Sequence, residues 1–114
     1  EVVAETLLEA MRPGAKISEL QALSRDAYRK ANVSNADDAV IFFHGLGLSH
    51  MDIQLTHPDG SPNGDWLLEE NMVVPMHLLY PGGSKERYWL EEVVHVTKDG
   101  GRPLFSWGFK ALTQ

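Results

Sequence analysis

The segment YWLEEVVHVTKDGG, residues 88–101, does most to define the fold. Its β-branched and aromatic residues predict a strand over 88–97, and the Lys-Asp-Gly-Gly sequence that follows predicts a tight turn. Because alternate side chains of a strand point to opposite faces of a sheet, Glu91 and Glu92 lie on different faces. The face that contains Glu92 is otherwise apolar, so one of the two carboxylates is predicted to have apolar neighbours unless the strand bulges. A buried carboxylate needs a charged partner or a metal. The pattern does not say which glutamate is buried, and an edge strand with both near solvent is the alternative.

Upstream of this segment, the sequence predicts two helices. Residues 1–12 repeat apolar side chains near the helical period, and the Arg-Pro-Gly sequence at 12–14 ends that helix. Ser18 and Gln21 have the spacing of a capping box, which predicts a second helix from this point to residue 31.

Shorter runs predict the remaining strands. The apolar runs at residues 40–43 and 72–80 favour β-structure, and residues 103–107 predict a closing strand. Residues 55–66 are rich in Gly, Pro, Asn and Asp and predict a loop. Two helices followed by antiparallel strands indicate an α+β domain.

The composition excludes several classes of function. The chain of 114 residues has a net charge of −6, which argues against nucleic acid or an anionic membrane as a partner because phosphate binding needs a basic surface. There is no cysteine, so disulfides and thiolate metal sites are excluded. No apolar run approaches the roughly 20 residues of a spanning helix, and a cytoplasmic protein is the default expectation. Because the chain starts at Glu1 inside a helical pattern, we expect it to be part of a longer protein.

Two histidines occupy unusual positions in the sequence. His77 is the one ionisable residue of an otherwise apolar predicted strand, and His44 ends an apolar run directly before Gly45. Glycine beside a histidine lets a ligand or a backbone approach closely. A histidine in an apolar strand is more often a hydrogen-bonded core residue than a metal ligand, so the residues alone leave both interpretations open.

Three segments carry a family resemblance: HGLGL at residues 44–48, LEENMVVPMH at 68–77 and LEEVVHVTKDG at 90–100. In this order they resemble the C-terminal half of the pita-bread metallopeptidases, which include methionine aminopeptidase, aminopeptidase P, prolidase (Xaa-Pro dipeptidase) and the metal-free creatinase. The resemblance covers nearly the whole chain. It implies half of a pita-bread fold, with two N-terminal helices packed on a mainly antiparallel sheet. Residues 1–114 would then be the C-terminal portion of a catalytic domain whose N-terminal half is absent.

The resemblance also implies site residues. It places His44 and Glu91, rather than Glu92, at metal-binding positions, and it puts His77 where the family has a glutamate that binds metal directly. His50 would be the catalytic histidine that contacts substrate. It lies six residues after His44, whereas the family spacing is seven, so either the loop is one residue shorter or the role is lost. Asn71 replaces a family glycine at a point where the backbone is expected to be left-handed.

The implied function is that of a metal-dependent hydrolase related to Xaa-Pro peptidases. The family uses a divalent metal such as manganese, cobalt or zinc, and the intact protein would act on a peptide or on a small amidine or amide. The two metal-binding aspartates of the family come from an earlier hairpin that this sequence does not contain. The two-metal site therefore cannot be assembled from this chain, which is expected to be inactive on its own. Because family members often dimerise, a homodimer is a further expectation.

Two alternatives stay open. One is a metal-free, creatinase-like hydrolase or a non-catalytic binding protein that keeps the fold, because the neutral imidazole of His77 removes a negative charge from a site built for two dications. In the other, His44, His77 and Glu91 form a set of two histidines and one carboxylate, which suits a single zinc or iron with open coordination positions.

Overall fold

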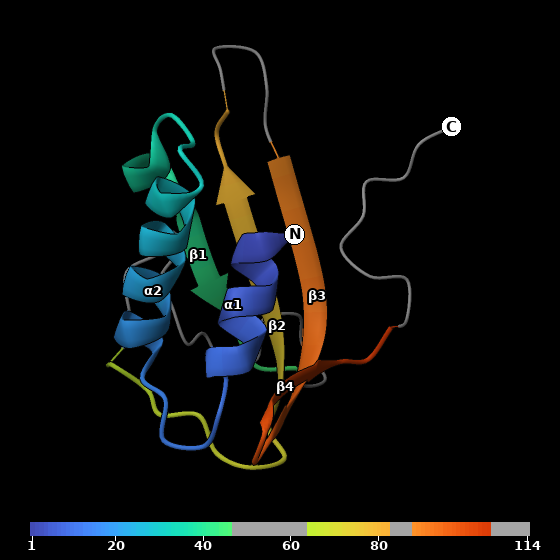
Figure 1. The fold of residues 1–114 in the computed structure, drawn as a ribbon. Coiled ribbons are helices and arrows are strands. Elements are labelled where there is room, and N and C mark those ends of the chain that lie inside the picture. The colour runs from blue at the N-terminus through green and yellow to red at the C-terminus, as the bar shows by residue number, and fades with distance from the viewer. Residues whose placement is uncertain (47–63, 83–87, 106–114) are drawn as a thin grey trace.

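The computed structural model describes residues 1–46, 64–82 and 88–105, and this part of the chain has two layers. Helices α1 (Val2–Ala10) and α2 (Ile17–Lys30) pack on one face of an antiparallel sheet (Figure 1). The sheet has the order β1-β2-β3-β4, and the short 3-10 helix η1 (Ala36–Asp38) precedes it. The strands are β1 (Val40–Phe43), β2 (Val73–Tyr80), β3 (Tyr88–Thr97) and β4 (Gly100–Pro103).

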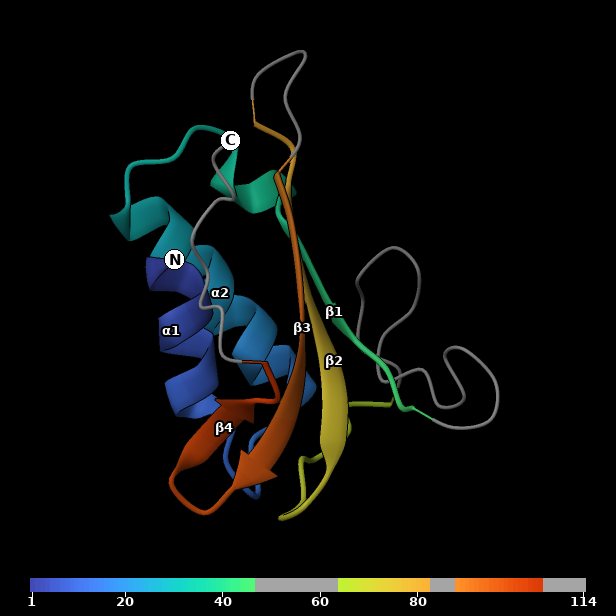
Figure 2. The ribbon, with the colours of Figure 1, turned by 90° about the vertical axis from the view of Figure 1, so that its right-hand side faces the viewer.

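Figure 2 views the sheet on edge and shows both helices on the same side of it. We call the sheet face that points away from α1 and α2 the distal face. The predicted arrangement of two helices on an antiparallel sheet is therefore observed. Most of the predicted loop at residues 55–66 lies outside the described residues. In the described part of the chain, neither helix is long and apolar enough to cross a membrane.

The predicted capping box of the second helix is wrong. Lys16 is the N-cap residue of α2 and makes no side-chain cap hydrogen bond. The Ser18 hydroxyl instead donates to Oδ1 of Asp65 at 2.6 Å, and Nε2 of Gln21 donates to the carbonyl of Ile41 at 2.8 Å. A carboxylate is a stronger acceptor than a neutral group, and a buried carbonyl must find a donor. Both side chains therefore tie α2 to segments distant in the sequence. The first amides of the helix are also satisfied from a distant segment, because the Ile17 amide donates to the Trp66 carbonyl at 3.0 Å and the Ser18 amide to Oδ1 of Asp65 at 3.4 Å.

The closing strand also begins earlier than the sequence predicts. Thr97 pairs with Gly100 across a two-residue turn, so β4 runs from Gly100 to Pro103 and not over residues 103–107. Gly100 has a φ angle of 130°, which residues with a side chain rarely adopt, and this conformation lets the chain reverse without a longer loop. Residues from 106 onward lie outside the described part of the chain.

The space between the sheet and the helices is filled almost entirely by apolar side chains. They include Leu7, Met11, Ile17 and Leu20 from the helical layer, and Ile41, Phe43, Val74, Met76, Val94 and Val96 from the strands. Glu92 points to the same side and is only 4% exposed, whereas Glu91 lies on the distal face. Glu92 is therefore the carboxylate with apolar neighbours. The alternative with both glutamates near solvent is wrong, because Glu92 is buried.

The contact between β4 and α1 can be tested with two glycines. A Cβ atom on Gly100 would lie 3.1 Å from the carbonyl oxygen of Leu8, whereas one on Gly14, which also has a positive φ angle, would have open space around it. We expect Gly14→Ala to lower the free energy of unfolding by about 1–2 kcal/mol through backbone strain alone. Gly100→Ala should cost about 1–2 kcal/mol more because it adds a clash with α1. Equal losses in urea denaturation of the two variants would contradict the described packing of β4 on α1.

Candidate metal centre

The register of three neighbouring strands brings the candidate residues together on the distal face. In the central strand β2, His77 pairs with Phe42 of β1 on one side and with Glu91 of β3 on the other. His44 follows Phe42 by two residues, so its side chain projects to the same face. Directly paired residues of antiparallel strands have adjacent side chains. Segments far apart in the sequence therefore supply one compact group of side chains.

The donor atoms of this group converge. Nε2 of His44 lies 3.0 Å from Nε2 of His77, and the same His77 atom lies 3.5 Å from Oε1 of Glu91. One ligand atom from each of the three residues falls within 4.8 Å of the others. His44 and His77 are 1% and 4% exposed, whereas the side chain of Glu91 is 48% exposed. The group therefore consists of two buried imidazoles with a carboxylate accessible from solvent.

A hydrogen bond fixes which nitrogen His44 presents to the group. Nδ1 of His44 lies 2.8 Å from the carbonyl oxygen of Gly45. A carbonyl oxygen can only accept, so Nδ1 carries the proton, and in the neutral ring Nε2 then carries the lone pair. In metal sites, a partner of this kind orients the ring and selects the nitrogen that binds the ion. His77 consequently donates its Nε2 proton in the hydrogen bond between the two histidines.

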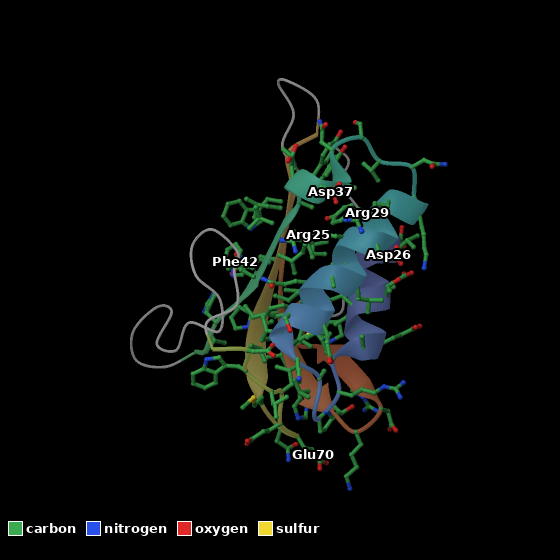
Figure 3. The ribbon with its side chains drawn as sticks, turned by 90° about the vertical axis from the view of Figure 1, so that its left-hand side faces the viewer. Arg25, Asp26, Arg29, Asp37, Phe42 and Glu70 are labelled. Carbon is green, nitrogen blue, oxygen red and sulfur yellow. The ribbon has the colours of Figure 1, made fainter. Side chains whose placement is uncertain are left out.

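Aromatic rings hold His77 in place. The ring of Phe42 stacks on that of His77, with centroids 4.1 Å apart and an interplanar angle of 8°. Trp89 packs at a steep angle against both rings, 5.9 Å from His77 and 6.5 Å from Phe42. Figure 3 shows Phe42 on the side of β1 away from α2. Such packing limits the orientations of the imidazole and removes water from around it, which strengthens its electrostatic interactions.

The sequence analysis did not identify Phe42 or Trp89 as site residues. Alternation does place Trp89 on the face of Glu91, and Phe42 on the face of His44. What the sequence did not provide was the register, which sets Phe42 beside His77 and not beside another residue of β2. The structure thus adds an aromatic flank to the predicted group of ligands.

The donor set is chemically suited to a divalent metal ion. Neutral imidazole nitrogen and carboxylate oxygen are the usual ligands of zinc and of its neighbours in the first transition series. Within residues 1–46, 64–82 and 88–105, these three residues form the one group of three or more histidine, aspartate and glutamate side chains with converging ligand atoms. The residues present therefore fit a divalent ion.

The structure separates the remaining candidates from this group. Glu92 faces the helices, and its Oε1 accepts a hydrogen bond from the Val93 amide at 2.9 Å. His95 lies further along β3, with its Nε2 3.0 Å from Oδ1 of Asn71. Asn71 has the expected left-handed backbone, with a φ angle of 69°. His50, the predicted substrate contact, lies outside the described residues.

Comparisons with known proteins identify the family and the fold of the chain. The family model of metallopeptidase family M24 matches residues 2–98 of the chain. No curated protein sequence matches the chain significantly. Among solved structures, the X-Pro aminopeptidase from Thermotoga maritima MSB8 has a TM-score of 0.71 at 21% sequence identity, over 95% of this chain and 29% of that one.

Two further solved structures are similar. The prolidase from Pyrococcus furiosus has a TM-score of 0.63 at 22% identity, over 91% of this chain and 29% of its own. Dipeptidase PepE from Mycobacterium ulcerans has a TM-score of 0.67 at 20% identity, over 90% of this chain and 26% of its own. At these identities the likeness concerns the fold, and the predicted pita-bread architecture is confirmed. The chain spans less than a third of the length of these relatives.

The different environments of the two glutamates lead to a stability prediction. Glu92→Leu should leave the free energy of unfolding unchanged or raise it by up to about 2 kcal/mol, because it removes a carboxylate from apolar surroundings. Glu91→Gln, at a half-exposed position, should change it by less than about 0.5 kcal/mol. Urea denaturation at neutral pH measures both effects. A loss of several kcal/mol in Glu92→Leu would show that this carboxylate has a stabilising role that its surroundings do not explain.

Proposed function

The chain belongs to metallopeptidase family M24, and from this we propose that it is the C-terminal portion of a hydrolase that cleaves peptides at an Xaa-Pro bond. A peptidase-like hydrolase follows from the family match and from the prolidase and dipeptidase folds that the chain resembles. The Xaa-Pro specificity is part of the proposal. The observation that supports it most directly is the convergence of His44, His77 and Glu91 on the distal face.

In this proposal, His44, His77 and Glu91 hold a divalent ion, which would be manganese, cobalt or zinc. A bound ion of this kind polarises a carbonyl group and lowers the pKa of a bound water, which supplies a nucleophile for amide hydrolysis. The half-exposed Glu91 lies on the side from which a peptide can approach. The two histidines form the buried side of the site, and the rings of Phe42 and Trp89 pack against His77.

The described part of the chain supplies three ligand groups, and we propose that hydrolysis requires more. A peptidase also needs groups that bind the substrate and stabilise the transition state. We assign one of these roles, contact with the substrate, to His50. The remaining groups would come from parts of a longer protein, so residues 1–114 alone should be inactive. A cytoplasmic location and a homodimer remain predictions.

One observation favours a second candidate function, a metal-free hydrolase of the creatinase type or a binding protein without catalysis. His44 and His77 hydrogen-bond to each other directly, so the two Nε2 atoms have a partner without an ion. A glutamate at residue 77 would instead place a second carboxylate beside Glu91, and the repulsion between them would favour a cation. Activity measurements distinguish the two candidates.

We expect a longer protein that contains residues 1–114 to hydrolyse Xaa-Pro dipeptides when manganese, cobalt or zinc is added, and residues 1–114 alone to be inactive. His44→Ala and Glu91→Gln should each lower kcat/KM by about 100-fold or more, because each removes a proposed ligand of the ion. Glu70→Gln is the matched control, since Glu70 lies at the end of the molecule far from Phe42 and near Lys98 (Figure 3). It should retain full activity.

Two results would contradict the proposal. Hydrolysis that persists in the presence of a strong chelator and in both ligand variants would favour the metal-free alternative. A longer protein that binds no metal and cleaves no Xaa-Pro dipeptide would favour the binding protein.

A further inference from the structure

The three donor atoms lie within 4.8 Å of one another, close to the spread of ligands around one ion. Zinc lies about 2.0–2.2 Å from imidazole nitrogen and carboxylate oxygen, so donors around one ion are roughly 2.9–3.5 Å apart at bond angles of 90–110°. The two direct separations here are 3.0 Å between the histidines and 3.5 Å between His77 and Glu91. The ions of a two-metal site lie about 3.5–4 Å apart and need ligands spread over both. The three donors here lie within 4.8 Å of one another, and the described residues supply no further ligand for a second ion.

The charge of the group leads to the same conclusion. When an ion binds, the proton of His77 moves from Nε2 to Nδ1, so that His44 and His77 contribute neutral nitrogen ligands and Glu91 contributes one negative charge. Within the described residues, no second aspartate or glutamate joins them. One dication bound to this set leaves a net charge of about +1, whereas two dications leave about +3 beside two buried imidazoles. Uncompensated charge in such surroundings is unfavourable.

The ligand types select among ions. Two imidazoles and one carboxylate suit zinc, nickel, copper and cobalt, whereas magnesium, calcium and manganese prefer oxygen ligands. His77 decides this preference. At this position the family resemblance implies a glutamate, and the histidine replaces its oxygen ligand with a nitrogen ligand. The surrounding contacts also make the site rigid: His44 is oriented by the Gly45 carbonyl, and His77 by the Phe42 ring. Ligands held in place before binding lose little conformational freedom when the ion enters.

We propose that residues 1–114, on their own, bind one divalent ion through Nε2 of His44, Nε2 of His77 and the Glu91 carboxylate, and that they select zinc, nickel, copper or cobalt over manganese and magnesium. The inference rests on the same three residues as the proposed function, but it concerns only the number and the kind of ion. It requires neither hydrolysis nor any other part of a longer protein. The open side at Glu91 leaves coordination positions for water or a substrate group.

The test is calorimetric titration of the metal-free chain with zinc, manganese and magnesium in turn. We expect one zinc per chain, bound at least about 100-fold more tightly than manganese, and no measurable magnesium binding. His77→Gln should weaken zinc binding by at least about 10-fold. His77→Glu should narrow the ratio of zinc to manganese affinity, because it restores an oxygen ligand.

His95→Gln is the matched control. His95 is a histidine on the same strand and the same face as Glu91, four residues further on, and its Nε2 contacts Asn71 and not the metal group. Its loss should leave zinc binding unchanged. Should His77→Gln fail to fold, Glu91→Gln replaces it, because that position is half-exposed. The increase in melting temperature that zinc causes in the parent chain should then be lost in Glu91→Gln and kept in His95→Gln.

The possible failures are distinct from those of the proposed function. Two zinc ions per chain, or manganese bound as tightly as zinc, would overturn this inference and leave hydrolysis by a longer protein intact. The absence of zinc binding, or equal weakening by His77→Gln and His95→Gln, would overturn the assignment of the site in this chain. Failure of a longer protein to hydrolyse peptides, with one zinc bound as described, would overturn the proposed function alone.

Discussion

The site depends on the strand register that sets His77 of β2 between Phe42 of β1 and Glu91 of β3. Because side chains alternate along a strand, a slip of β2 by one residue would turn His77 into the core and Met76 out to the distal face. Met76 is completely buried against the helical layer, and its apolar surface opposes that slip. The packing that fills the core is thus the same constraint that brings the three candidate ligands together.

The sheet consequently serves two purposes with its two faces. One face packs against α1 and α2 and stabilises the domain, and the other presents polar and aromatic groups on neighbouring strands. Glu91 and Glu92 illustrate the division, since they are adjacent in sequence and lie in opposite environments. Ligands that project from hydrogen-bonded strands are held more firmly than ligands on loops. Their positions are therefore set largely before any ion binds, which a selective site requires.

Local sequence patterns alone were enough to predict α1, α2, β1, β2 and β3, and alternation correctly placed Glu91 and Glu92 on different faces. It failed where the deciding partner is distant in the sequence. Ser18 bonds to a residue 47 positions away, so its local spacing suggested a cap that does not form. The contact between His44 and His77 spans 33 positions, and only the family resemblance suggested that these residues share a site. The early start of β4 depends on the backbone angle of Gly100, which the pattern of side chains does not reveal.

The central claim is that the strand register brings the imidazoles of His44 and His77 and the carboxylate of Glu91 close enough together on the distal face to bind one ion. Anomalous diffraction at the zinc edge, from crystals of this chain grown with zinc, tests it most directly. The account predicts one anomalous peak within bonding distance of Nε2 of His44, Nε2 of His77 and the carboxylate of Glu91. Two peaks at this place, or zinc bound at His95 with none between these three residues, would contradict it.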